Sequence, residues 1–190
     1  LTNNTTAAGN TAVGYNALAA NTTGTSNVAV GAYALDANTA ADDLVAVGYT
    51  ALTTYNRSGG GDAKTVGIGN AAFHDLTTGT QNTAVGHQAG YSQTSVNDAA
   101  FFGFKAGYNT STGAQNTAIG SQALLANTTA SLNTAVGYQA MLSNTTGTSS
   151  VAVGAYALDA QTTATQNTAV GVSAMSATTT GSYNTAVGSG

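Results

Sequence analysis

The side chains that could carry out chemistry are few in this chain, and they lie near its middle. The cations are Arg57, Lys64 and Lys105, and the histidines are His74 and His87. No His and Asp pair recurs at a fixed distance from a serine, and no two carboxylates are spaced as a general acid and base would need. The two histidines are roughly one unit apart in the repeat described below, and no third strong ligand joins them into a metal site. We therefore expect neither catalysis, nor a bound metal, nor a cofactor.

One stretch with residue types suited to surface recognition is the segment 55–64. It supplies Tyr55, Arg57 and Lys64, which could form a lateral bulge for an acidic or glycan partner. The same segment is also explained without any ligand, as a surface insertion that a loop tolerates. Both interpretations remain open at the level of the sequence.

A second stretch is aromatic and carries one cation. Tyr91, Phe104, Lys105 and Tyr108 are close together in the sequence, and aromatic rings beside a cation can stack on a sugar. Repacking of a core is the alternative. In that case each tyrosine would fill the space left where a leucine of the repeat described below is replaced by glycine.

These residues are positioned by a repeat that runs through the whole chain. Its clearest phrase is Asn133-Thr134-Ala135-Val136-Gly137, and the unit from Asn133 to Ser149 defines positions 1 to 17. The glycine at position 5 recurs once in each unit, and one unit is longer than the others because it contains the insertion 55–64. Glycine adopts a positive φ without penalty, so we expect a structural corner at each of them. These glycines are Gly14, Gly31, Gly48, Gly69, Gly86, Gly103, Gly120, Gly137, Gly154, Gly171 and Gly188.

The repeat predicts an all-β fold, a parallel β-solenoid with one 17-residue coil per unit. Positions 2 and 4 are mostly β-branched around a small residue, which indicates a strand with its β-branched side chains facing inward. Position 8 is Ala in every complete unit and position 9 is mostly large and apolar, so we expect a second short strand there. The Asn-Thr-Thr stretch that follows is typical of a return loop. Residues 1–190 are then one repeat domain of about eleven coils, and we expect it to be a segment of a longer fibre.

Such a coil is thin, and this suggests that several copies assemble. Val at position 4 and Ala at position 8 would fill the inside and leave little room for the large residue at position 9. A stripe of Leu and Met left in water would be an aggregation surface. We therefore expect position 9 to pack against other copies of the chain in a homotrimer.

Composition excludes several function classes. The chain has 190 residues, of which 5% are charged, a net charge of −4, and no cysteine. Three cations cannot neutralise a run of phosphates, so we expect no nucleic-acid binding. The longest apolar runs are far shorter than a membrane span, so we expect no membrane insertion by this segment.

The phrase Asn-Thr-Ala-Val-Gly, followed by an Ala-Leu pair and an Asn-Thr-Thr-Gly loop, occurs in residues 10–24. This pattern resembles the head repeats of YadA-like trimeric autotransporter adhesins and the related repeats of bacteriophage tail fibres. The resemblance implies a left-handed β-roll, three chains side by side, and an extracellular place on a virion tail fibre or a bacterial cell surface. It also implies attachment to a cell-surface glycan or protein receptor. The adhesin heads usually have a shorter repeat, and the strict 17-residue unit is more similar to the phage fibres.

An ice-binding solenoid is the alternative function. Thr22-Thr23, Thr128-Thr129 and Thr145-Thr146 would form a double threonine ladder along the return loops. Other coils interrupt this ladder, and a loop does not assure the flat surface that ice binding needs. A polysaccharide-degrading tailspike is a third possibility, which no catalytic constellation supports.

Overall fold

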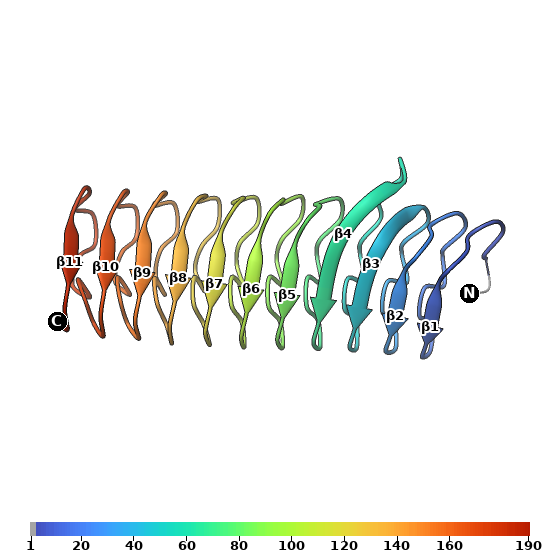
Figure 1. Cartoon of the computed structure of the whole chain (residues 1–190), viewed down its shortest axis with the longest axis horizontal. Coiled ribbons are helices and arrows are strands. Elements are labelled where there is room, and N and C mark those ends of the chain that lie inside the picture. Colours follow the sequence, from blue (N-terminus) through green and yellow to red (C-terminus); the bar gives the residue numbers. More distant parts are fainter. Residues whose placement is uncertain (1–2) are drawn as a thin grey trace.

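The computed structural model describes residues 3–190, which form a rod of stacked coils (Figure 1). One parallel sheet runs along the rod, and its strands follow one another in sequence order. We number each coil after its strand. The strands are β1 (Thr11–Val13), β2 (Val28–Val30), β3 (Ala41–Val47), β4 (Gly61–Ile68), β5 (Thr83–Val85), β6 (Ala100–Phe102), β7 (Thr117–Ile119), β8 (Thr134–Val136), β9 (Val151–Val153), β10 (Thr168–Val170) and β11 (Thr185–Val187). The predicted parallel β-solenoid with 17-residue spacing is confirmed.

The strand expected at positions 8 and 9 is not formed within residues 3–190, where each coil contributes a single strand. Positions 7 and 9 have positive φ in coil after coil, as at Gln139 (55°) and Met141 (51°). The backbone therefore winds through turns instead of extending. Hydrogen bonds still join these turns between coils, such as the one that Met141 N donates to Ala157 O (2.9 Å). The prediction of two strands per coil was wrong because alternating small and large residues also suit a tight, buried turn.

The glycine at position 5 forms a corner in every coil. Its φ lies between 130° and 140° throughout. This part of the φ range is accessible almost exclusively to glycine. A Cβ at Gly137 would also overlap the carbonyl oxygen of Gly154, the same corner in the next coil. The corner thus needs glycine both for its conformation and for the close approach of neighbouring backbones.

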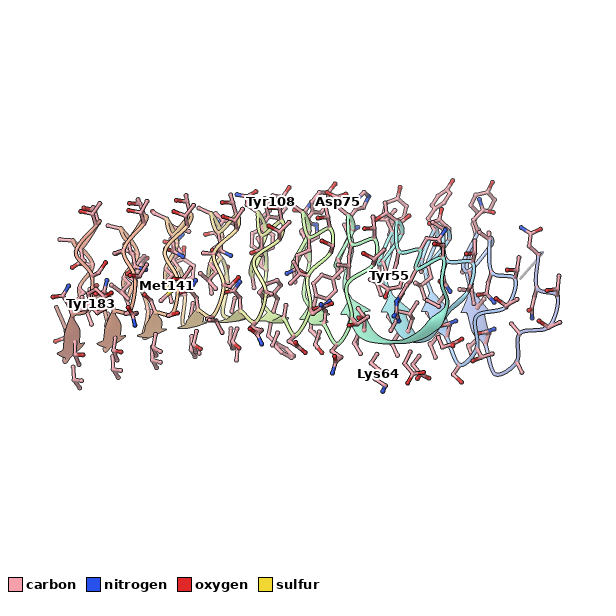
Figure 2. The ribbon with its side chains drawn as sticks, turned by 90° about the horizontal axis from the view of Figure 1, so that it is seen from above. Tyr55, Lys64, Asp75, Tyr108, Met141 and Tyr183 are labelled. Carbon is pink, nitrogen blue, oxygen red and sulfur yellow. The ribbon has the colours of Figure 1, made fainter. Side chains whose placement is uncertain are left out.

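Small residues of the strand and large residues of the turns fill the interior together. Ala135 at position 3 and Met141 at position 9 are fully buried, and Figure 2 shows Met141 inside the coil. The residues at position 4 point outward instead, with Ile119 42% and Val153 37% exposed. The expected inward face was therefore wrong. The fully buried residues at position 9 are Leu18, Leu35, Leu52, Phe73, Leu124, Met141 and Leu158.

Position 9 consequently needs no partner chain, and the expectation that it packs against other copies was wrong. Its side chains already lie against the alanines at positions 3 and 8 of their own chain. The coil has room for them because the strand turns its small side chain inward. Any argument for assembly has to rest on the outer surface.

Buried asparagines at positions 1 and 12 close the return loop. Asn133 Nδ2 and Asn144 Nδ2 both donate to the carbonyl oxygen of Gly147, at 2.8 and 2.9 Å. Asn133 Oδ1 in turn accepts a hydrogen bond from Ser150 N in the next coil (3.0 Å). Each asparagine side chain of this kind satisfies buried backbone groups and joins one coil to the next.

Gln93 departs from this pattern and gives a testable prediction. It is fully buried at position 12, yet neither Nε2 nor Oε1 has a hydrogen-bond partner. Gln161, at the same position, donates to Asn144 Oδ1 (3.3 Å) and accepts from Asn167 Nδ2 (2.9 Å). An unpaired buried amide costs free energy, so we expect Gln93→Leu to raise the free energy of unfolding by about 1–2 kcal/mol. Gln161→Leu should lower it by a similar amount, and denaturant unfolding of both variants checks the pair. Equal effects of the two substitutions would contradict the prediction.

Candidate functional site

The insertion 55–64 extends two neighbouring strands. β3 and β4 have 7 and 8 residues, and Figure 1 shows the start of β4 projecting beyond the row of other coils. Both cations of the segment are engaged within it. Lys64 Nζ lies 3.1 Å from Asp62 Oδ2, with side chains 59% and 61% exposed, and Arg57 Nη1 donates to Asp62 O (3.1 Å). On this exposed arm Lys64 is therefore paired with a carboxylate, whereas Arg57 is held by a backbone carbonyl.

Tyr55 is not a surface residue, and its assignment to surface recognition was wrong. It is fully buried at position 12, and Figure 2 shows it inside the coil. Its hydroxyl donates to Gly79 O (2.9 Å), the position 15 carbonyl of the next coil. Burial raises the pKa of Tyr55 to about 12, and the nearby charge of Arg57 opposes this rise. The tyrosine thus supplies the donor that asparagine supplies in other coils, together with a ring that fills the core.

The raised pKa of Tyr55 predicts a loss of stability at alkaline pH. The folded pKa of about 12 is above the ordinary value of 10.0, so the unfolded chain releases this proton first. The stabilising effect of the neutral phenol is complete below pH 10 and is lost as the pH rises toward 12. We expect the wild type to lose about 2 kcal/mol of unfolding free energy over this range. Tyr55→Phe should cost about 1 kcal/mol at neutral pH and show a flatter alkaline profile.

Denaturant unfolding across this pH range measures the effect, and Tyr183→Phe is the matched control. Tyr183 is 76% exposed, so its removal should leave the profile of the wild type unchanged. Parallel profiles for the two phenylalanine variants would show that Tyr55 does not cause the alkaline loss.

A set of outward-facing residues of coils 4 to 6, mostly aromatic, forms one continuous surface group. Tyr91 stacks on His74 with ring centroids 4.8 Å apart, and on Tyr108 with centroids 5.2 Å apart. Lys105 Nζ lies 5.1 Å from the ring centroid of Tyr108 and 5.4 Å from that of Phe104. The ring of Phe104 in turn stacks on a second histidine, at 5.6 Å. We call this group the aromatic patch, and its members are His74, His87, Tyr91, Phe104, Lys105 and Tyr108.

The aromatic patch lies on the face of the rod opposite the sheet. Figure 2 shows Tyr108 and Asp75 together at the edge far from the strands, whereas Lys64 lies on the sheet side. His74 Nδ1 is 2.7 Å from Asp75 Oδ1, so the carboxylate orients the ring that begins the stack. Burial, then Asp75 and Tyr108, raise the pKa of Tyr91, whose hydroxyl therefore stays protonated and able to donate.

The structure brings together four of the residues expected to take part in recognition, Tyr91, Phe104, Lys105 and Tyr108. It places Arg57 and Lys64 elsewhere, in the insertion. The role of His74 as the first ring of the stack was missed. Its place one unit of the repeat before Tyr91 could have revealed it, because equal positions of successive coils stack.

The tyrosines of the patch do not fill the space of the missing leucines, so that version of the repacking hypothesis was wrong. Phe101 fills it from position 3, on the opposite wall of the coil, and is fully buried. A Cβ at Gly107 would lie 2.6 Å from two ring atoms of Phe101. The core thus repacks by exchanging large and small residues across the coil, and Tyr91 and Tyr108 remain on the surface.

Residues 3–190 contain no group of three His, Cys, Asp or Glu side chains placed to hold a metal ion, and no pocket. Nor does this part of the chain contain a helix long and apolar enough to cross a membrane. Comparison with protein-family models, with curated proteins and with solved structures finds no match to this chain.

Proposed function

We propose that this chain is a segment of a trimeric surface fibre, such as a phage tail fibre or a bacterial adhesin, that mediates attachment outside the cell. The observation that carries the proposal is an apolar ladder on the outer face of the sheet. Every coil contributes one Val, Ile or Phe at position 4. Within the rod the most exposed of these side chains, those of Ile68, Phe102, Ile119, Val153 and Val170, are 37–42% exposed. We call this ladder the sheet face, and its members are Val13, Val30, Val47, Ile68, Val85, Phe102, Ile119, Val136, Val153, Val170 and Val187.

A second copy of this chain is the partner that fits the sheet face best. Successive strands pair residue for residue, as Ile119 does with Val136, so the ladder repeats at the strand spacing of about 4.8 Å. A partner with the same period can pack against every step, and another copy has that period. An apolar stripe that runs along the whole rod is the kind of surface that marks a protein interaction site. The number of three chains and the left-handed coil are taken from the resemblance to adhesin heads and tail fibres.

The mechanism of such a fibre is mechanical. Backbone and side-chain hydrogen bonds connect each coil to the next along the rod. Contacts between sheet faces would remove the apolar stripe from water. Attachment would then combine weak contacts that recur on three chains, which raises the overall avidity without a single strong site.

The hydrodynamic mass of the purified chain at micromolar concentration tests the proposal. We expect a species of three times the 18.5 kDa of one chain. Ile119→Asp combined with Val136→Asp should dissociate it, because charges would enter the contact between copies. Thr129→Asp combined with Thr146→Asp is the matched control on exposed loop positions and should leave the mass unchanged. A wild type that sediments as a monomer would refute assembly.

Cross-linking provides a second readout, because the chain has no cysteine of its own. In a threefold arrangement around the sheet faces, Val136→Cys places thiols of neighbouring copies close together. We expect this variant to form disulfide-linked pairs on mild oxidation and Thr146→Cys to form few. Similar yields from both variants would count against the sheet face as the contact.

The ice-binding alternative is weakened by the hydrogen bonds of its threonine ladder. Thr22 Oγ1 donates to Thr39 O (3.0 Å), and Thr128 Oγ1 donates to Thr145 O (3.1 Å). The first threonine of each pair therefore uses its hydroxyl proton to join two coils, which explains the ladder without ice. Thermal hysteresis of the purified chain is the measurement that would restore this alternative.

A further inference from the structure

The unusual residues of this chain are concentrated on a few coils. All three cations, both histidines and all four phenylalanines lie between residues 57 and 105. The coil itself does not require them on its surface. Coil 7 has Ser121, Gln122 and Leu125 at the positions where coil 6 has Phe104, Lys105 and Tyr108, and both coils carry the same corner and strand.

The geometry at the centre of the aromatic patch disfavours stacking of a neutral sugar on Tyr91. Tyr91 is nearly parallel to both neighbours, at 8° to His74 and 17° to Tyr108. Both faces of its ring are therefore covered, and a sugar ring that needs a free aromatic face finds none there. What the stack offers to a ligand is ring edges and hydroxyl groups, repeated at the spacing of the coils.

Lys105 gives the patch a positive charge that no carboxylate contacts. Among the described residues the short contacts between basic and acidic side chains join Lys64 to Asp62 and His74 to Asp75, so neither Lys105 nor Arg57 takes part in one. The carboxylate of the patch, that of Asp75, lies at its His74 end. Its ammonium group lies instead over the rings of Phe104 and Tyr108, where the surrounding apolar surface strengthens its attraction for an anion. An ammonium group beside phenol hydroxyls matches an anionic group that is flanked by hydroxyls.

We propose that the aromatic patch binds an acidic polysaccharide, with Lys105 contacting a carboxylate or sulfate group and the tyrosine hydroxyls contacting neighbouring sugar hydroxyls. A polymer suits the patch because the stack extends over three successive coils. The patch lies opposite the sheet, so it stays accessible when copies of the chain cover the sheet face (Figure 2). This inference rests on the proposed attachment function and names the class of receptor.

The test compares binding of the whole chain to dextran sulfate, to polygalacturonate and to neutral dextran. The first two polymers distinguish sulfate from carboxylate as the recognised anion. We expect the wild type to bind at least one acidic polymer and not to bind neutral dextran. Added salt should weaken the binding to the acidic polymer. No binding to either acidic polymer would overturn the proposal.

Two matched substitutions locate the site. Lys105→Gln and Lys64→Gln remove the same charge, and both positions are occupied by glutamine in the following coil, at Gln122 and Gln81. All four residues have positive φ, so neither variant should perturb the fold. We expect Lys105→Gln to raise the half-saturating polymer concentration about tenfold and Lys64→Gln to leave it within about twofold. Equal losses in both variants would show unspecific charge attraction and overturn the proposal.

A combined variant removes the outward-facing residues that coil 6 contributes to the patch. Phe104→Ser, Lys105→Gln and Tyr108→Leu together give coil 6 the outer surface of coil 7. Binding should then be lost while the circular dichroism spectrum and the hydrodynamic mass stay those of the wild type. Retained binding would overturn the proposal. If the chain is a trimer and binds neither acidic polymer, this inference alone is refuted. If it is a monomer that binds them, only the assembly proposal is refuted.

Discussion

Gly137→Ala should lower the free energy of unfolding by about 3 kcal/mol or more, although it adds a single methyl group. The φ of Gly137 is 140°, a conformation that alanine adopts only under strain. The added Cβ would also overlap the carbonyl oxygen of Gly154 in the next coil, which backbone hydrogen bonds hold in place. Relief would require neighbouring coils to separate. Thermal unfolding followed by circular dichroism measures the loss, and hydrogen exchange should show the coils on both sides of Gly137 opening first.

Gly59→Ala is the matched control for this prediction. Gly59 lies in the insertion, and a Cβ built there would have no heavy atom within 4 Å. Its φ is not in the positive range, so alanine meets neither strain nor collision. We expect a change within about 0.5 kcal/mol. A similarly mild result at Gly137 would mean that the corners tolerate a side chain.

The coil could be predicted from the sequence because several positions of the repeat show the same period. The glycine at position 5 returns in every unit of the repeat, and a polar Asn-Thr-Thr loop returns with it in many of them. A parallel solenoid is the arrangement that stacks identical residues on each other at every position. The corner could be predicted for the same reason, since glycine is the residue type that a positive φ selects.

The direction of the side chains could not be predicted from the period alone. Alternation along Thr134-Ala135-Val136 shows that the strand has two faces, but it does not show which one is inside. That choice depends on the volume available across the coil. Met141 occupies this volume from the opposite wall, so the small Ala135 turns inward and Val136 turns outward. Hydrophobicity by itself favours the reverse orientation, which explains the error.

The positions of the candidate residues follow from the sequence where the coil spacing determines them, and they do not follow from it where a loop determines them. Tyr91 and Tyr108 are one unit of the repeat apart, so their stacking follows from the repeat. Tyr55 is different, because its burial depends on an acceptor, Gly79 O, that the return loop places inside the rod. Nothing in the residue types of segment 55–64 reveals that carbonyl, and a tyrosine beside an arginine has the appearance of a binding residue.

The exchange of large and small residues in coil 6 leads to a prediction about the energetic coupling between Phe101 and Gly107. Phe101→Ala should cost about 3–5 kcal/mol, because it empties the space that the ring fills. Gly107→Leu alone should also be strongly destabilising, since its Cβ would lie 2.6 Å from ring atoms of Phe101. Together the two substitutions reproduce the Ala118 and Leu124 pair of coil 7. Gly107 has a φ of 61° and Leu124 one of 51°, so leucine fits the backbone without rearrangement. We expect the double variant to recover most of the lost stability, which denaturant unfolding of the four proteins would measure.

Substitution of Gly90 is the control. It tests whether the interior of the rod accepts a leucine at any position 9 glycine once Phe101 is removed. A Cβ at Gly90 would meet Phe101, but it would also lie 2.6 Å from Cδ1 of Phe73, which removal of Phe101 leaves in place. Phe101→Ala with Gly90→Leu should therefore remain strongly destabilised, although Gly90 has the same φ of 61° as Gly107. Rescue at both glycines would mean that the interior adapts freely to added volume. Rescue at Gly107 alone would show that Phe101 and this glycine form one packing unit.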